Sequence, residues 1–310
     1  MTELANAKTE AEVDAAAAKL NAQIAQNKDQ NGNAGAVTRI IMLDELRGFC
    51  VLAMVLYHSF FVLATQFDVA WGQTLYEFFR PAQPVFAALF ILISGFCARF
   101  SHDVRKRGLL LAVIAMAITA ITVFLLPALG FKDTQVWFGV LHLLAASMLL
   151  CGFIGKIIVK IPAFLGVLLC LGLFLLTAPI SQGYLGMFGL RFNLPEGLYQ
   201  TNVLAFLGFY NKETFYSWDF FPLLPYLFIF LFGVYMSKIA RSGGSGWVAV
   251  QMRDGKKIWD SRDNLPAFCY KPHSAFFGLL GRHALPIYLL HVPVFYGLFY
   301  FVRFVAAIGA

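Results

Sequence analysis

Seven long apolar runs constrain what this chain can fold into. They lie at about residues 40–63, 76–98, 108–127, 136–155, 161–178, 219–239 and 283–305. Each run is roughly 18 to 24 residues long, the length that a helix needs to cross the hydrocarbon core of a bilayer. The runs therefore predict an all-α integral membrane protein with about seven transmembrane helices.

The composition excludes a soluble globular protein. Hydrophobic residues make up 59% of the 310 residues and charged residues only 13%, with a mean hydropathy of +0.70. Soluble domains carry roughly a quarter of charged residues. A single core cannot bury this much apolar surface, so we expect a bilayer to cover it.

Basic side chains indicate the orientation of the spans. If the N-terminus is cytosolic, 19 of the 24 Lys and Arg residues fall on the cytosolic side and five fall outside. Cytosolic loops of membrane proteins carry such an excess. The sequence thus predicts an N-in, C-out topology in the cell (plasma) membrane. This topology accounts for the net charge of +7 without a nucleic-acid partner.

The polar segments predict the domain organisation. Residues 1–38 are polar and Ala-rich and lack the pattern of a signal peptide, so we expect a disordered cytosolic tail. Residues 39–310 form the membrane domain, which carries a cytosolic insert at 241–274. Within the insert, WVAVQMRDGKKIWD alternates around an Asp-Gly pair and predicts a β-hairpin. In the outer connection, the apolar stretch near 200–209 is too short to span, so we expect a re-entrant or interfacial segment.

Three ionisable side chains of the first run share one face of the expected helix. Arg47 and His58, which begin and end RGFCVLAMVLYH, are about 20° apart around a helix and about 16 Å apart along it. Asp44 precedes Arg47 by one turn. Ionisable groups within a span need a partner or a function. Asp44 and Arg47 alone also fit an ion pair that reaches the headgroups, and His58 alone also fits an interfacial histidine.

Later runs carry polar residues at corresponding depths. His142 lies in the outer part of the fourth run, Asp219 begins the sixth at the outer boundary, and His291 lies near the middle of the seventh. Either histidine alone also fits a core residue with satisfied hydrogen bonds. Because several runs contribute such groups, we expect a polar cavity across the bundle. Its expected lining is Asp44 and Arg47 at the cytosolic end and His58, His142 and Asp219 at the outer end.

Five segments resemble a known family, in the same order. They are RIIMLDELRGFCVLAMVLYHSFF, FILISGFC, WFGVLHLLA, DFFPLLPYLFIFLFGV and LGRHALPIYLLHVPV. Together they resemble a bacterial membrane family grouped with the catalytic domain of heparan-alpha-glucosaminide N-acetyltransferase, over about residues 37–300. The spacing of Arg47 and His58 is also similar to that in the wider superfamily of transmembrane acyltransferases, which modify surface glycans.

The resemblance implies transfer of an acetyl or other acyl group from cytosolic acetyl-CoA to an extracytoplasmic sugar amine or hydroxyl. By matching positions, Arg47 lies at the acyl-CoA end and His58 at the transfer site. His58 then acts either as general base or through an acetyl-histidine intermediate. The expected supporting residues are Asp44, Arg282 and His291 for acyl-CoA and His142 and Asp219 for orienting His58 or the acceptor.

Two other classes of function remain open at this stage. A proton-coupled small-solute transporter also uses intramembrane His, Asp and Arg, although we find no inverted repeat. The second alternative is a non-catalytic membrane partner or sensor.

As partners we expect the lipid bilayer, acyl-CoA and the acceptor, and the sequence also allows a homodimer. The five cysteines show no metal-ligand spacing, so no metal is expected.

Overall fold

Seven helical stretches of the chain are long and apolar enough to cross a membrane. The computed structural model describes residues 39–101, 103–128, 134–242, 250–253, 256–259 and 262–308, and the seven are counted within these. They span Ile41–Thr65, Ala70–Ala98, Val104–Ala128, Val140–Lys160, Ala163–Gln182, Leu223–Ala240 and Ala284–Val302. The predicted all-α membrane class is confirmed, while the N-in orientation stays a prediction.

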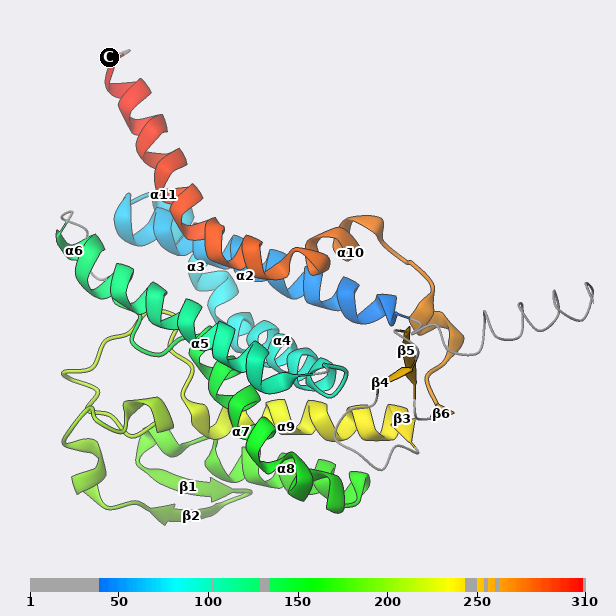
Figure 1. The fold of residues 1–310 in the computed structure, drawn as a ribbon. Helices are drawn as coiled ribbons and strands as arrows, with labels where there is room; N and C mark the ends of the chain where they lie inside the picture. Colours follow the sequence, from blue (N-terminus) through cyan, green and yellow to red (C-terminus); the bar gives the residue numbers. More distant parts are fainter. Residues whose placement is uncertain are drawn as a thin grey trace, which may run out of the picture. The chain divides into compact units, whose positions relative to one another are not determined.

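Figure 1 shows the order of the elements along the chain. The α-helices are α2 (Ile41–Gln66), α3 (Ala70–Phe79), α4 (Gln83–Ala98), α5 (Val104–Ala120), α6 (Leu126–Ala128), α7 (Val140–Lys160), α8 (Ala163–Thr177), α9 (Leu223–Ala240), α10 (Ala275–Arg282) and α11 (Ala284–Ile308). The 3-10 turns are η1 (Arg80–Ala82), η3 (Ile180–Gln182), η4 (Glu196–Tyr199), η5 (Ala205–Leu207) and η6 (Ala267–Tyr270), and η2 (Ile121–Leu125) is π-helical. The strands are β1 (Tyr184–Met187), β2 (Leu190–Asn193), β3 (Arg241–Ser242), β4 (Val250–Arg253), β5 (Lys256–Trp259) and β6 (Arg262–Asp263).

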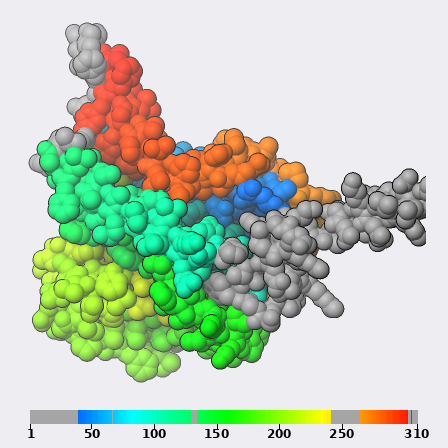
Figure 2. All heavy atoms as spheres, in the orientation of Figure 1, coloured from blue at the N-terminus to red at the C-terminus, as the bar shows by residue number. Residues whose placement is uncertain are grey.

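The helices differ in how far they are buried. Ile91 of α4, Leu143 of α7 and Phe230 of α9 are fully buried in the core. By contrast, α5 lies at the surface (Figure 2), where Leu109 and Val113 are exposed. Large apolar side chains on the outside are unfavourable in water but are solvated by lipid tails. The surface of the bundle therefore agrees with a membrane environment.

Glycines bring two pairs of helices into backbone contact. A Cβ atom at Gly48 of α2 would collide with the carbonyl oxygen of Phe277 in α10. A Cβ atom at Gly233 of α9 would likewise collide with the carbonyl oxygen of Leu92 in α4. Small residues allow this close approach, which membrane helices use because van der Waals contact drives their association. The α2–α10 contact positions one wall of the site described below.

The two ends of the bundle have different chemistry. We call the end where α2 begins the basic end. There Lys238 of α9 donates to the carbonyl oxygens of Val159 and Ile161, at 3.0 and 2.7 Å, and so caps the end of α7. We call the opposite end, formed by residues 134–139 and 178–222, the loop end.

The loop end contains little regular structure. β1 and β2 pair antiparallel, with Tyr184 opposite Asn193. The stretch 200–209, expected to be re-entrant or interfacial, forms only the single turn η5 before Gly208, whose φ is 111°. Val203 in this stretch is exposed. Whether the stretch enters a membrane stays a prediction.

The sixth span begins later than the sequence suggested. We expected it to open at Asp219, but α9 begins at Leu223. Asp219 lies in the preceding turn with a left-handed φ of 53°, a conformation that aspartate adopts more readily than most residues. The reason is proline: Pro225 disfavours helical geometry at Leu224, whose φ and ψ are −91° and 126°. The turn carries the Asp219 side chain into the bundle.

The insert contains the predicted hairpin. β4 and β5 pair antiparallel, with Val250 opposite Trp259 and Arg253 opposite Lys256, so the predicted hairpin is confirmed. The hairpin and the helices fall in different compact units. Residues 1–38, predicted to be a disordered tail, lie outside the described residues. The boundaries 39–310 and 241–274 stay predictions.

The glycine contacts predict that glycine-to-alanine substitutions at two positions differ in their effect on stability. Gly233→Ala should lower the free energy of unfolding by about 1–3 kcal/mol, because the methyl group overpacks the α4–α9 contact. Gly172→Ala on α8 is the matched control, since its methyl group would meet nothing within 4 Å. Thermal unfolding in detergent measures both. Equal melting temperatures for the two variants would contradict the contact.

Candidate active site

A buried histidine pair joins α2 to α11. Nδ1 of His58 lies 2.7 Å from Nε2 of His291, and the two rings stack with centroids 5.0 Å apart. His58 is only 3% exposed and His291 only 7%. The Trp218 ring, from the turn before α9, lies over His58 with centroids 5.2 Å apart. The pair is therefore held by three segments and shielded from solvent.

The hydrogen bonds of the pair determine which nitrogens carry protons. Nδ1 of His291 lies 2.6 Å from the carbonyl oxygen of Tyr288, which can only accept, so this Nδ1 is the donor. Nε2 of a neutral His291 ring must then accept from Nδ1–H of His58. Nε2 of a neutral His58 ring is left with an unshared electron pair. That is the state a general base requires.

Asp219 faces this nitrogen from the loop end. Its Oδ1 lies 3.9 Å from Nε2 of His58, and the Asp219 side chain is only 6% exposed. The hydroxyl of Tyr288 donates to Oδ2 at 2.6 Å. Burial raises the pKa of Asp219 to about 6, while hydrogen bonds from the Tyr288 hydroxyl and the Val140 N–H oppose that rise. Near neutral pH the carboxylate is therefore mostly ionised.

Two hydrogen-bond acceptors thus face each other without a donor between them. Oδ1 of Asp219 is buried and has no partner among the described residues. The cavity beside Asp219 is small, about 20 Å³, and is lined by Cys50, Tyr57 and Phe90 among others. This volume holds about one water molecule. A single O–H or N–H group in this cavity could donate to Asp219, whose Oδ1 lies 3.9 Å from Nε2 of His58.

A second cavity, of about 220 Å³, lies toward the basic end. We call it the arginine pocket, because Arg47 of α2, Arg107 of α5 and Arg282 at the end of α10 line it. Among the described residues of its lining, no side chain is acidic. Three guanidinium groups without a carboxylate in the lining favour a polyanionic ligand.

Two aromatic residues link the two cavities. Phe90 of α4 lines both of them. Tyr288 of α11 lines the arginine pocket, and its hydroxyl bonds the carboxylate of Asp219 at the other cavity. A molecule bound in the arginine pocket would therefore approach the His58–Asp219 gap past these two rings.

Asp44 orients Arg47 and does not itself line the pocket. Its Oδ1 lies 3.5 Å from Nη1 of Arg47, and its Oδ2 pairs with Arg39. The other terminal nitrogen of Arg47, Nη2, donates to Sγ of Cys97 at 3.1 Å. Contacts from α2 and α4 thus fix the guanidinium at the pocket wall.

Glu45 fixes the α10 wall of the pocket. Its Oε1 accepts from the backbone N–H groups of His273 and Ser274, at 2.7 and 2.8 Å. A carboxylate in this position caps the N-terminus of α10 and interacts favourably with the helix dipole. Together with the Gly48 contact, this cap sets the position of Arg282 at the other end of α10.

His142 has other partners. Nδ1 accepts from the N–H of Gly139 at 3.2 Å, and Nε2 lies 3.0 Å from the Thr119 hydroxyl, which itself donates to Val136 O. Both ring nitrogens are therefore used. Gly139 pairs with Phe220, next to Asp219, so His142 holds the turn on which Asp219 rests. In this structure it is a positioning residue, and a direct role in catalysis stays a prediction.

The structure groups the site residues differently from the grouping that we predicted from the sequence. It brings His58, Asp219 and His291 into one site, whereas the sequence had assigned His291 to acyl-CoA binding. Arg47 and Arg282 line one pocket. Sequence reasoning did not single out Tyr288, Trp218, Arg107, Cys97 and Glu45 as site residues. Of these, Tyr288 had a usable signal, because it precedes His291 by three residues and so shares a helix face with it.

Comparison with known proteins then identifies the family. Residues 39–293 match the family model described as heparan-alpha-glucosaminide N-acetyltransferase, catalytic. The chain belongs to this family. Family membership points to a membrane acyltransferase, and the matched range contains the histidine pair, Asp219 and the arginine pocket. No curated protein and no solved structure matches the chain.

The hydrogen bonds of His142 predict a loss of stability on substitution. His142→Ala should lower the free energy of unfolding by about 1–3 kcal/mol, because it leaves the Gly139 N–H without its partner. The exposed His283→Ala serves as control. Thermal unfolding measures both. A His142→Ala protein as stable as His283→Ala would remove the positioning role.

Proposed function

We propose that the protein transfers an acetyl or other acyl group from cytosolic acyl-CoA to an amine or hydroxyl of an extracytoplasmic sugar. One observation carries this proposal: Nε2 of His58 faces the buried carboxylate of Asp219, and Tyr288, which bonds that carboxylate, also lines a pocket with three arginines. The proposal includes the plasma membrane as the location and the cytosol as the side of the basic end, and the excess of Lys and Arg supports this orientation.

The arginine pocket suits the phosphates of CoA. CoA is a polyanion, and charge-assisted hydrogen bonds from guanidinium to phosphate are among the strongest in proteins. Arg47, Arg107 and Arg282 come from three different helices, so together they can surround a phosphate group. The pocket needs no metal for this binding.

The distance between the two parts of the site matches the donor. α2 is helical over Ile41–Gln66, so Arg47 and His58 are about 16 Å apart along its axis. An extended pantetheine arm reaches roughly 15–20 Å. With its phosphates at Arg47, the arm would pass Phe90 and Tyr288 and bring the thioester to the His58–Asp219 gap.

His58 then acts as general base at this gap. The acceptor donates its proton to Nε2 of His58 while its oxygen or nitrogen attacks the thioester carbon. The new C–O or C–N bond forms, the C–S bond breaks, and the proton on His58 passes to the departing thiolate of CoA. Asp219 stabilises the transient imidazolium, and His291 keeps His58 in the required tautomer. An acetyl-histidine route would use the same nitrogen as the nucleophile.

This division of roles predicts different effects for two substitutions. His58→Ala should keep the affinity for acetyl-CoA and lose about 100-fold or more in transfer rate, because only the base is removed. Arg47→Ala should weaken acetyl-CoA binding by about tenfold or more. Calorimetric titration of purified protein measures binding. Incorporation of labelled acetyl groups into envelope glycans by membrane vesicles measures transfer.

Arg80→Ala, at an exposed arginine of η1 outside the arginine pocket, is the matched control and should leave acetyl-CoA affinity unchanged. No binding of acetyl-CoA to the unsubstituted protein at millimolar concentration would overturn the proposal. Uptake of a solute by proteoliposomes, driven by a proton gradient, would instead establish the transporter alternative.

The raised pKa of Asp219 predicts a pH dependence. Below about pH 6 the carboxyl group is protonated and no longer stabilises a cationic His58. The ratio of the transfer rates of the unsubstituted protein and Asp219→Asn should therefore be large near pH 8 and shrink as the pH falls through about 6. Labelled acetyl incorporation across this range measures the ratio. A ratio independent of pH would show that the Asp219 charge has no part in transfer.

A further inference from the structure

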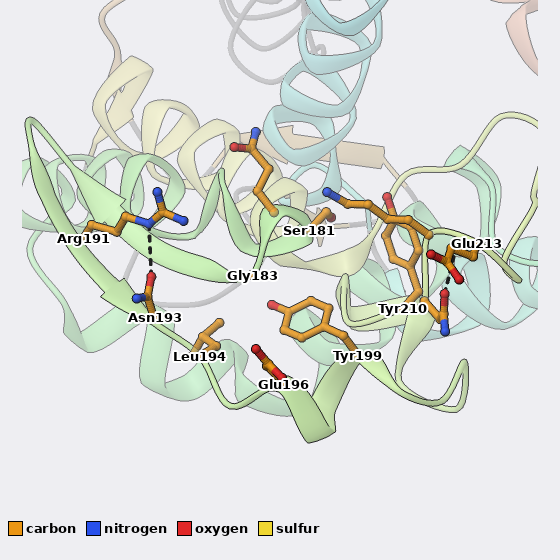
Figure 3. Close-up of a pocket in the computed structure, with 12 residues that line it drawn as sticks. Ser181, Gly183, Arg191, Asn193, Leu194, Glu196, Tyr199, Tyr210 and Glu213 are labelled. Carbon is orange, nitrogen blue, oxygen red and sulfur yellow. Dashed lines mark hydrogen bonds between the residues drawn. The ribbon is translucent and has the colours of Figure 1, made fainter.

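A polar hollow of about 630 Å³ opens within the connection 178–222 (Figure 3). We call it the loop-end hollow. Its walls come from η3, β2, η4 and residues 210–213. In Figure 3 the side chains of Arg191 and Asn193 stand on one side of the hollow and Tyr210 and Glu213 on the other, with Tyr199 between them. The volume falls within the roughly 300–1,000 Å³ of small-molecule sites.

The lining chemistry restricts the ligand. Two basic side chains, Arg191 and Lys212, are balanced by two acidic ones, Glu196 and Glu213. A polyanion would need an excess of positive charge, and an apolar ligand would need mostly apolar walls. Carboxylates, amides and cations in the lining supply both acceptors and donors. Sugar hydroxyls are suited to such walls, because each one both donates and accepts.

Part of the hollow is held in place by its own contacts. Nε of Arg191 donates to the side-chain oxygen of Asn193 at 3.1 Å, and its guanidinium lies over the Tyr184 ring at 4.2 Å. The Tyr199 hydroxyl donates to the carbonyl oxygen of Ile180 at 2.5 Å, which fixes the ring. Walls fixed before binding lower the entropy lost on binding.

The hollow is connected to the reaction site by ring contacts. Tyr210, in its lining, lies with its ring centroid 5.2 Å from that of Phe220. Phe220 follows Asp219 directly and pairs with Gly139 through the backbone. The same short segment thus carries one wall of the hollow, the carboxylate at the gap and the Trp218 ring over His58.

We propose that the loop-end hollow binds an oligosaccharide portion of the acceptor, apart from the group that receives the acyl chain. This role rests on the proposed function for its place in the reaction. The binding itself does not require acyl transfer. A neutral or charge-balanced oligosaccharide is the ligand class, and a monosaccharide, which fills only part of the hollow, binds less tightly.

Calorimetric titration of the full chain in phosphatidylcholine nanodiscs tests this role. Glycosidic detergents are avoided, since their sugar headgroups are themselves candidate ligands. The probes are linear tetrasaccharides of glucose, mannose, galactose and N-acetylglucosamine, each with its monosaccharide. At least one tetrasaccharide should bind about tenfold or more tightly than its monosaccharide.

Two variants connect the binding to the hollow. Leu194→Trp places a larger side chain in the lining and should abolish tetrasaccharide binding. Val203→Trp, in the same connection and outside the lining, should not. Glu196→Ala combined with Lys212→Ala removes two exposed polar groups without changing the net charge, and should weaken binding about tenfold or more even if Leu194→Trp does not fold.

The outcomes separate the two proposals. No preference for any tetrasaccharide, or a preference that both lining variants retain, would overturn the oligosaccharide site. Acetyl-CoA is titrated into the same preparations. Tetrasaccharide binding without acetyl-CoA binding would leave the hollow established and remove the acyltransferase function, and the reverse result would leave the function and remove the hollow.

Discussion

The hydrogen bond between His58 and His291 is the interaction on which the site depends. Hydrocarbon offers no partner to an imidazole, so each ring inside the bundle must find one in the protein. Here the Tyr288 carbonyl fixes His291, and His291 in turn fixes His58. The chain of bonds ends at a bare nitrogen that faces Asp219. Because each buried imidazole needs a hydrogen-bond partner, the two rings are bonded in a way that leaves Nε2 of His58 available as a base.

The arginine pocket and the cavity beside Asp219 have opposite character. The arginine pocket carries an excess of positive charge, while the cavity beside Asp219 holds little more than one water molecule. Phe90 lines both cavities, and Tyr288 lines the arginine pocket while its hydroxyl bonds the carboxylate of Asp219. Such an arrangement favours a long anionic donor on one side and a single small reacting group on the other. The loop-end hollow is a third, separate cavity, and its lining has balanced charge.

Sequence reasoning worked best where one helix carries the information. The common face of Arg47 and His58 follows from helix geometry alone, and α2 is helical over both residues. Sequence reasoning worked less well where the conformation of a turn sets the position of a side chain. Asp219 was expected within a span, yet prolines delay α9, and a left-handed residue directs the carboxylate inward. His142 lies at a depth similar to that expected for His58, but its side chain bonds Thr119 and Gly139.

The sequence by itself determined the membrane class, the seven spans, the hairpin in the insert and the resemblance to the acyltransferase family. These depend on run length, local alternation and ordered motifs, which the linear chain carries. Only the tertiary structure decided that His291 belongs with His58, that Arg107 joins Arg47 and Arg282, and that Tyr288 joins the two cavities. Such partners come from helices far apart in the chain, and their pairing depends on which helix faces pack together.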